Sequence, residues 1–313
     1  MNELQRNSID LSNENDSSAL FESFIEYLDI GEQSNATYTA AMRQFFRWIQ
    51  ENGIQQPDRS DIIRYRNQLR EEKKPATVQL YMTALRVFYS WAEDERFYPN
   101  VARHIKGAKI DRQHKKDALA AAQIARILRE FDRNKPAGIR DYALVYLMAT
   151  TGIRDVEAQR ANVGDLGTAG GSSVLYVQGK GQEEKARYVK IAAPVEDALR
   201  DYLRVRGSLP PEDPLFVSIS NHNSGGRLTT RSISRIVKTA FRAAGYDSER
   251  LTAHSLRHSA ATINLRSGGS LEETQEMLRH SSIATTMIYN HALAREENNS
   301  ELRVADQIQK NLH

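Results

Sequence analysis

Apolar residues recur three and four positions apart along most of the chain, and one short stretch breaks this helical period. That stretch, residues 172–192, reads SSVLYVQGKGQEEKARYVKIA and contains two β-rich runs, at 174–177 and 187–191. A polar turn that contains glycine joins the two runs, which is typical of a β-hairpin. The pattern therefore predicts a mainly α fold with one small β-hairpin or sheet.

Two domains are expected, because a chain of 313 residues is long enough to bury two separate cores. The polar residues 1–18 are predicted to form a disordered tail. Residues 19–102 are predicted to form an all-α domain of four helices. Their amphipathic patterns span residues 19–31, 34–54, 59–72 and 74–97.

Residues 117–297 are predicted to form the second domain, which contains the hairpin. Further helical patterns flank the hairpin, at residues 121–131, 137–153, 194–207 and 229–245. The pattern at 137–153 is apolar enough to be the buried centre of this domain. Residues 298–313 follow a polar break and are predicted to form a C-terminal tail helix, with Leu302, Ile308 and Leu312 at roughly helical spacing.

The net charge is only +3, but it arises from 43 basic and 40 acidic residues, so the local distribution matters more than the sum. The run RHIKGAKIDRQHKK, residues 103–116, carries six Lys or Arg against one Asp and has no clear period. We predict an interdomain linker there. Its lysines would neutralise phosphates if it lay along a nucleic acid; they are Lys106, Lys109, Lys115 and Lys116. A solvated linker is the alternative.

Basic residues also recur between the aromatic residues of the first domain, a pattern that could wrap a duplex. Arg43 and Arg47 are the candidate DNA contacts there. Arginines in water beside an aromatic core explain the same helices equally well.

The composition also bears on the compartment. The chain has no cysteine, so disulfides and thiolate metal sites are excluded and a reducing compartment fits. The N-terminal residues lack the apolar segment of a signal peptide, and no stretch reaches the roughly 20 apolar residues of a membrane span. We therefore expect a cytoplasmic protein.

Residues 254–291 concentrate four histidines, three arginines and one tyrosine. His254 and His258 are four positions apart, a spacing at which one helical face can bind zinc. The zincin motif needs glutamate where this chain has Ser255, and no carboxylate completes a ligand set, so no metal is predicted. A structural role in the core explains His258 and His291 better. His254 differs, because Arg257 shares its helical face and two adjacent basic groups favour a bound anion.

Three residues in the middle of the chain could take part in the same chemistry. Arg154 follows a tight Thr-Gly turn at the start of a helix that includes Glu157, where its guanidinium could bind two phosphate oxygens. Lys180 lies between glycines at the tip of the hairpin. Taken alone, Lys180 would be interpreted as an ordinary exposed lysine.

Four motifs in this order resemble the catalytic domain of the tyrosine recombinases, the family of phage lambda integrase and the Xer proteins, over about residues 115–295. They are TGIRDVEA, VQGKGQEEKARYVKI, HSLRHSAAT and LRHSSIATTMIYNH. The first domain resembles the SAM-like core-binding domain of that family in length and helical pattern. One position departs from the family pattern, because Arg279 stands where glycine is usual.

The resemblance implies a site-specific recombinase that cleaves and rejoins DNA through a 3′-phosphotyrosine intermediate, with no metal and no cofactor. Tyr289 would be the nucleophile. Arg154, Arg257 and His280 would stabilise the phosphate, Lys180 would be the general acid and His254 an acid or base near the tyrosine. Glu157 would orient the cationic cluster.

The family also implies particular partners. They are a double-stranded DNA recombination site, further copies of the chain as a dimer on one site and a tetramer in synapsis, and accessory directionality or host proteins. The C-terminal helix would dock on a neighbouring protomer or cap its own domain, and the protein would be nucleoid-associated. The function alternatives are an integrase of a mobile element, a Xer-like resolvase, a type IB topoisomerase and a catalytically silent DNA-binding protein.

Overall fold

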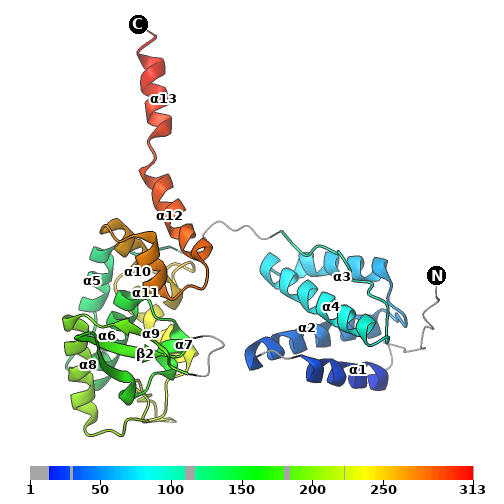
Figure 1. The fold of residues 1–313 in the computed structure, drawn as a ribbon, viewed down its shortest axis with the longest axis horizontal. Helices are drawn as coiled ribbons and strands as arrows, with labels where there is room; N and C mark the ends of the chain where they lie inside the picture. Colours follow the sequence, from blue (N-terminus) through cyan, green and yellow to red (C-terminus); the bar gives the residue numbers. More distant parts are fainter. Residues whose placement is uncertain (1–13, 29–30, 110–116, 180–183, 222, 313) are drawn as a thin grey trace. The chain divides into compact units, whose positions relative to one another are not determined.

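The computed structural model describes residues 14–28, 31–109, 117–179, 184–221 and 223–312. It divides into two compact units, Met1–Gln113 and His114–His313 (Figure 1). Both units are mainly helical, and the second contains one small antiparallel sheet. The predicted fold class is therefore confirmed. In the described part of the chain, no helix is both long and apolar enough to cross a membrane.

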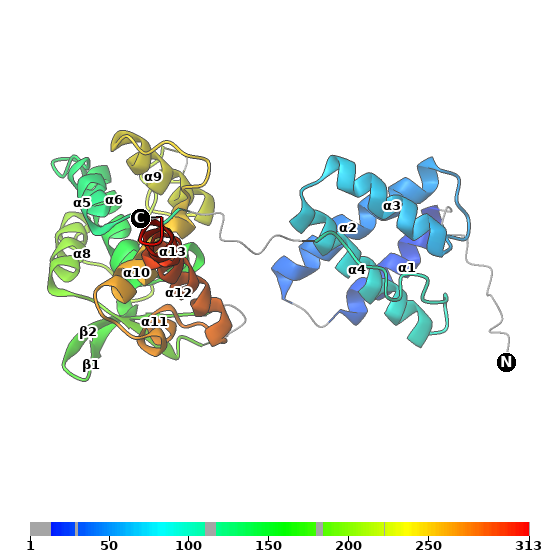
Figure 2. The same cartoon turned by 90° about the horizontal axis from the view of Figure 1, so that it is seen from above.

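The described residues of the first unit form four helices (Figure 2). They are α1 (Glu14–Tyr27), α2 (Glu32–Glu51), α3 (Arg59–Glu72) and α4 (Pro75–Asp94). Large aromatic side chains fill the space between them, among them Phe24, Phe45 and Phe88, each fully buried. Residues 14–18 are helical, so the predicted disordered tail extended too far. Because residues 14–18 are polar, the sequence did not indicate that α1 begins there. The apolar residues Leu20 and Phe24 of this helix pack into the core.

The residues that follow α4 are attached to the first unit by arginine side chains. Four arginines of α3 and α4 donate hydrogen bonds to main-chain carbonyls of residues 103–107. The pairs are Arg59 with Arg103 (2.6 Å), Arg66 with Lys106 (3.3 Å), Arg70 with Gly107 (2.7 Å) and Arg86 with Ile105 (2.9 Å). We name residues 103–107 the strap.

The strap changes the interpretation of the basic run at 103–116. Ile105 is buried in the aromatic core, and a Cβ at Gly107 would lie 2.1 Å from the Gln79 amide oxygen. The first half of the predicted linker is therefore packed against the first unit. Periodicity could not indicate this, because the arginines bond to main-chain carbonyl groups of the strap, and Ile105 is its single apolar side chain. Residues 110–116 lie outside the described residues.

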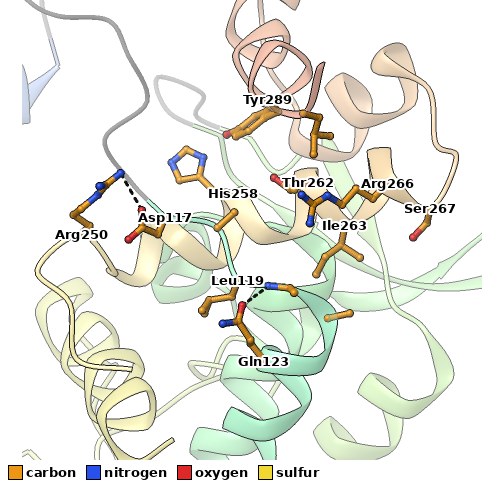
Figure 3. Close-up of a pocket in the computed structure, with 14 residues that line it drawn as sticks. Asp117, Leu119, Gln123, Arg250, His258, Thr262, Ile263, Arg266, Ser267 and Tyr289 are labelled. Carbon is orange, nitrogen blue, oxygen red and sulfur yellow. Dashed lines mark hydrogen bonds and ion pairs between the residues drawn. The ribbon is translucent and has the colours of Figure 1, made fainter. Parts of the chain in front are cut away.

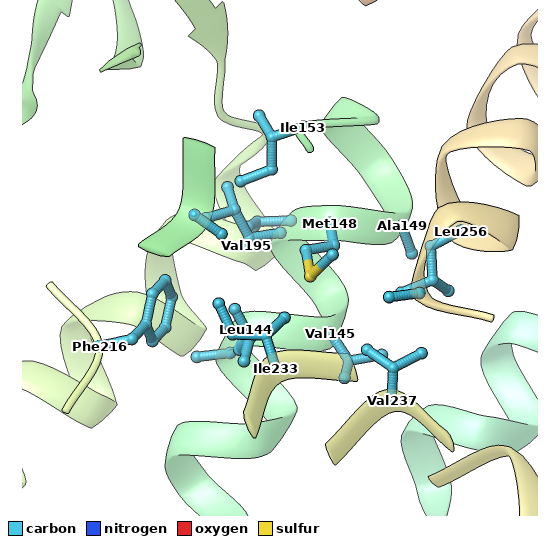
Figure 4. Close-up of a cluster of buried hydrophobic side chains, with 14 of the residues drawn as sticks. Leu144, Val145, Met148, Ala149, Ile153, Val195, Phe216, Ile233, Val237 and Leu256 are labelled. Atoms are coloured by element: carbon cyan, nitrogen blue, oxygen red, sulfur yellow. The ribbon is translucent and has the colours of Figure 1, made fainter. Parts of the chain in front are cut away.

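The second unit is built around α6. Its helices are α5 (Ala121–Arg129), α6 (Pro136–Thr151), α7 (Asp155–Arg160), α8 (Ala193–Arg206), α9 (Thr230–Ala243), α10 (Ala253–Arg266), α11 (Leu271–Leu278), α12 (Ile283–Glu297) and α13 (Ser300–Gln309), with a short 3₁₀ turn at Val163–Asp165. Figure 4 shows Leu144, Val145 and Met148 of α6 surrounded by side chains from α8, α9 and α10. The prediction that this apolar helix is the buried centre of its domain is confirmed.

The sheet has three antiparallel strands in the order β1-β2-β3. The strands are β1 (Leu166–Ala169), β2 (Ser172–Val177) and β3 (Arg187–Lys190). Leu175 of β2 pairs with Leu166 on one side and Val189 on the other. The predicted hairpin corresponds to β2 and β3. Strand β1 was missed, because LGTA has only four residues and a single β-branched one, and its turn to β2 depends on two left-handed glycines, Gly170 and Gly171.

Candidate active site

Arg257 lies at the centre of the site, on α10, and is only 1% exposed. Its Nη1 donates to the Gly152 carbonyl at 2.5 Å, and its Nη2 donates to the Leu278 carbonyl. Gly152 ends α6 in the left-handed conformation, and a Cβ there would lie 2.6 Å from the Leu278 side chain. Burial, together with Arg154 and Arg279, lowers the pKa of Arg257 to about 10. Arg257 therefore joins the end of α6 to the end of α11 and remains a cation at neutral pH.

Arg154 and Glu157 form the start of α7, one turn apart. The Glu157 carboxylate accepts one bond from the Arg154 guanidinium at 2.8 Å and another from the Arg154 main-chain N–H at 2.8 Å. Glu157 is 1% exposed, whereas the Arg154 side chain is 29% exposed. The carboxylate thus anchors an arginine whose charge remains accessible to a ligand.

His280 follows the last turn of α11. Its Nδ1 lies 2.8 Å from the Thr286 hydroxyl on α12. Burial, together with the positive charges of Arg257 and Arg154 and smaller contributions from His254 and Arg279, lowers the pKa of His280 to about 4. The imidazole is therefore neutral near pH 7 and can donate a hydrogen bond through one ring nitrogen.

Tyr289 of α12 lies between two histidines. Its ring centroid is 5.2 Å from that of His258 and 6.3 Å from that of His280, and the His280 ring is nearly parallel to it. The tyrosine is only 4% exposed. Burial raises the pKa of its hydroxyl, and Arg257 and Arg154 oppose that rise. A tyrosine in this state needs a base or a further cationic group beside its hydroxyl before it can act as a nucleophile.

His254 is exposed in the first turn of α10, and its ring meets that of His258 edge to face at 4.6 Å. His258 is buried and contacts the tyrosine ring, which its interpretation as an inert core residue did not predict. The H-x-x-R-H spacing was the available signal, because it puts His258 one turn after His254. No group of three or more potential metal ligands occurs among the described residues.

A cavity of about 580 Å³ opens beside the tyrosine (Figure 3). Tyr289 and His258 lie at one end of it, and Gln123 and Leu119 of the segment before and within α5 line the opposite side. Asp117 and Arg250 form an ion pair of 2.9 Å at its edge. The buried tyrosine ring therefore has open space on one side.

The remaining candidates are distributed as follows. Lys180 lies outside the described residues, as do Lys115 and Lys116. Lys106 and Lys109 are exposed on and beside the strap, and Arg43 and Arg47 are exposed one turn apart on α2. The structure thus brings Arg154, Arg257, His254, His280 and Tyr289 into one site of the second unit.

Comparisons with known proteins find a matching family model for each of the two units. A family model described as "Phage integrase family" matches residues 117–296, and one described as "Phage integrase, N-terminal SAM-like domain" matches residues 19–97. The chain is 36% identical to the tyrosine recombinase XerC of Actinobacillus pleuropneumoniae over 216 residues, covering 69% of this chain and 67% of that protein. It is 31% identical to the tyrosine recombinase XerD of Lacticaseibacillus casei over 284 residues, covering 87% and 93%.

Two solved structures share the fold. A XerH site-specific recombinase bound to palindromic difH substrate, in a post-cleavage complex, matches with a TM-score of 0.72 at 23% identity, covering 94% of this chain and 85% of that one. A lambda integrase dimer bound to a COC′ core site matches with a TM-score of 0.68 at 18% identity, covering 86% and 96%. Both likenesses concern the fold.

Proposed function

Because the chain belongs to the phage integrase family of tyrosine recombinases, we propose that the site around Arg257 is where it cleaves and rejoins DNA strands. The chain is a site-specific recombinase, an enzyme of DNA recombination. One observation supports this assignment of the site. A tyrosine, two arginines and a neutral histidine from four separate segments lie close together.

The arginines and the histidine would bind the phosphate that is attacked. Arg154 is anchored by Glu157 yet its side chain is 29% exposed, so its guanidinium can reach the non-bridging oxygens. Arg257 adds a fixed, largely desolvated positive charge, which acts more strongly at low dielectric. His280 would add one neutral hydrogen bond.

The Tyr289 hydroxyl would attack the phosphorus, forming the bond to the 3′ phosphate as the bond to the 5′ oxygen breaks. Lys180 would donate a proton to the departing 5′ oxygen, and His254 would accept or return the tyrosine proton. The reverse attack by a 5′ hydroxyl would rejoin the strand. Because the phosphotyrosine stores the bond, no metal, nucleotide or other cofactor is required.

Covalent capture tests this assignment. DNA that the protein selects from genomic fragments, nicked close to the cleavage point, should become joined to the wild type in a complex that survives SDS. Peptide mapping should locate the phosphate on Tyr289. A type IB topoisomerase would instead relax supercoiled plasmid without bringing two sites together, and a silent DNA-binding protein would give no covalent complex.

The basic run at 103–116 is proposed to contact DNA phosphates. Replacing Lys106, Lys109, Lys115 and Lys116 by glutamine should weaken binding to all sequences alike. The slope of log K against log salt should become shallower by up to about 0.9 for each phosphate contact that is lost. Mobility-shift titrations at several salt concentrations measure this slope. A variant with Arg200→Gln and Arg204→Gln on α8 is the control, and an unchanged slope in the lysine variant would refute the contact.

The C-terminal helix α13 is proposed to dock on a neighbouring protomer. Residues 301–312 are exposed, including Leu302 and Ile308 at 64% and 57%. Deleting residues 299–313 should therefore leave folding and binding of one protomer to DNA intact, while cooperative binding and pairing of two sites are lost. Native gels and synapsis assays separate these steps. Loss of the folded state on deletion would show instead that the helix packs on its own unit.

Binding to a DNA recombination site would also determine how copies of the chain assemble and where in the cell they act. A dimer would occupy one double-stranded site, and two dimers would form the synaptic tetramer, with accessory proteins setting direction. Such an enzyme would work in the cytoplasm at the nucleoid, as an integrase of a mobile element or a Xer-like resolvase.

A further inference from the structure

Arg279 adopts a backbone conformation that is unusual for its residue type. It ends α11 in the left-handed region, with φ 56° and ψ 44°. An L-residue there is strained relative to glycine. The other non-glycine residues with positive φ in the described part of the chain, Arg96 and His104, are exposed. The side chain of Arg279 is only 6% exposed. Its buried contacts must therefore offset the backbone strain of the left-handed conformation.

The Arg279 guanidinium connects α11 to the start of α7. Its Nη2 lies 2.6 Å from one Glu157 oxygen, and its Nη1 donates to the Met277 carbonyl at 2.8 Å. The same Glu157 oxygen accepts the main-chain N–H of Arg154, and the other oxygen accepts the Arg154 guanidinium. One buried carboxylate therefore bridges Arg279 and Arg154.

We propose that Arg279 is a positioning residue for DNA strand cleavage, which fixes Glu157 so that Glu157 directs the Arg154 guanidinium toward the phosphate. This inference rests on the proposed function of the site. Arg279 does not touch the reacting atoms in this arrangement, and it acts through the carboxylate.

The charge of Arg279 keeps the bridge intact. Burial is the largest influence on the pKa of Glu157 and raises it, but Arg279 and Arg154 more than offset this, so the pKa lies below its usual value. The charged groups that face Glu157 are Arg154 on its own helix, Arg279 on α11 and Arg257 on α10. Without Arg279 the pKa of Glu157 should rise, and a protonated carboxyl would accept fewer bonds from Arg154.

The turn after α11 allows the side chain to be tested separately from the backbone. The Arg279 N–H bonds to Glu276, the His280 N–H bonds to Gln275, and the Gln275 amide bonds back to the His280 carbonyl. Glycine favours the same left-handed conformation. Arg279→Gly should therefore preserve the turn that presents His280 while removing the contact with Glu157.

The experiment measures covalent capture against pH, with DNA affinity and thermal unfolding in parallel, for Arg279→Gly, Glu157→Gln and the double variant. Arg279→Gly should bind DNA normally but cleave about tenfold more slowly at neutral pH. The loss should deepen as pH falls through the raised pKa of Glu157 and diminish as pH rises, because the active form is the carboxylate. Arg96→Gly, at an exposed left-handed position, is the matched control.

The double variant identifies the titrating group. It should lose the acid-side inflection that Arg279→Gly adds to the wild-type profile, and it should cleave no more slowly than Glu157→Gln alone, because both changes break the same bridge. If the single variant unfolds, Arg279→Gln, which keeps much of the side chain without its charge, should show the same pH-dependent loss. Wild-type cleavage in Arg279→Gly at every pH, or persistence of the added inflection in the double variant, would overturn the proposal. Failure of the wild type itself to capture DNA would instead refute the proposed function.

Discussion

Replacing Tyr289 by phenylalanine is expected to abolish covalent capture of DNA while DNA affinity stays close to that of the wild type. The change removes the nucleophilic oxygen and keeps the ring between His258 and His280, so the packing of α12 should persist. Without that oxygen, position 289 cannot form a bond to the phosphate. Capture on a nicked suicide substrate, read on SDS gels beside mobility-shift titrations, measures the two properties separately.

Two controls test whether the loss of capture is specific to Tyr289 and whether capture needs a metal. Tyr188→Phe removes the hydroxyl of a tyrosine that is 44% exposed on β3, and it should capture DNA like the wild type. A chelator should leave wild-type capture unchanged, because the proposed chemistry uses side chains alone. An adduct that still forms in Tyr289→Phe would mean that another residue is the nucleophile. Loss of capture under chelation would revive a zinc site at His254 and His258.

Local features of the fold could be predicted because their causes lie within a few residues of each other. The apolar period of α6 predicted its burial, and the alternating runs around a glycine turn predicted β2 and β3. A capping box opens α11 in the same local way, with the Ser270 hydroxyl and the Glu273 carboxylate each accepting the other's main-chain N–H. In each case the sequence pattern and the structure it stabilises share one short segment.

The geometry of the site depends on distant contacts, which spacing does not reveal. Arg257 is fixed by carbonyl groups 105 and 21 residues away in sequence, at Gly152 and Leu278. The family resemblance suggested which side chains to propose for the site, but not that Arg257 would be buried or that His258 would contact Tyr289. Main-chain acceptors carry no sequence signature, and the strap at 103–107 went unpredicted for the same reason.

Arg279 is the clearest example of a contact that the sequence alone could not predict. The sequence identified it as a departure from the usual glycine and left the local backbone in question. The structure keeps the left-handed turn that glycine would favour, and the arginine reaches Glu157, 122 residues earlier in the chain. An arginine is disfavoured in this left-handed conformation, and its bond to the distant Glu157 explains why it is there. Such a contact could not be inferred from either segment alone.

The second large effect is expected at Lys180. Lys180→Ala should slow cleavage about 10²- to 10⁴-fold, because the 5′ oxygen would have to leave without a proton. A substrate whose bridging 5′ oxygen is replaced by sulfur has a leaving group that needs no protonation. Cleavage of that substrate by the Lys180 variant should return to nearly the wild-type rate, measured as single-turnover covalent capture.

Rescue by sulfur separates a proton donor from a residue that only binds phosphate or shapes the hairpin, since a lost binding contact would slow both substrates alike. Lys185 provides the matched control, because its ammonium group lies 2.5 Å from the Asp165 carboxylate and 3.3 Å from the Arg160 carbonyl. Lys185→Ala should respond equally to the oxygen and sulfur substrates, and Tyr289→Phe should cleave neither. If sulfur fails to restore Lys180→Ala, the proton must come from elsewhere, and the exposed His254 becomes the next donor to test.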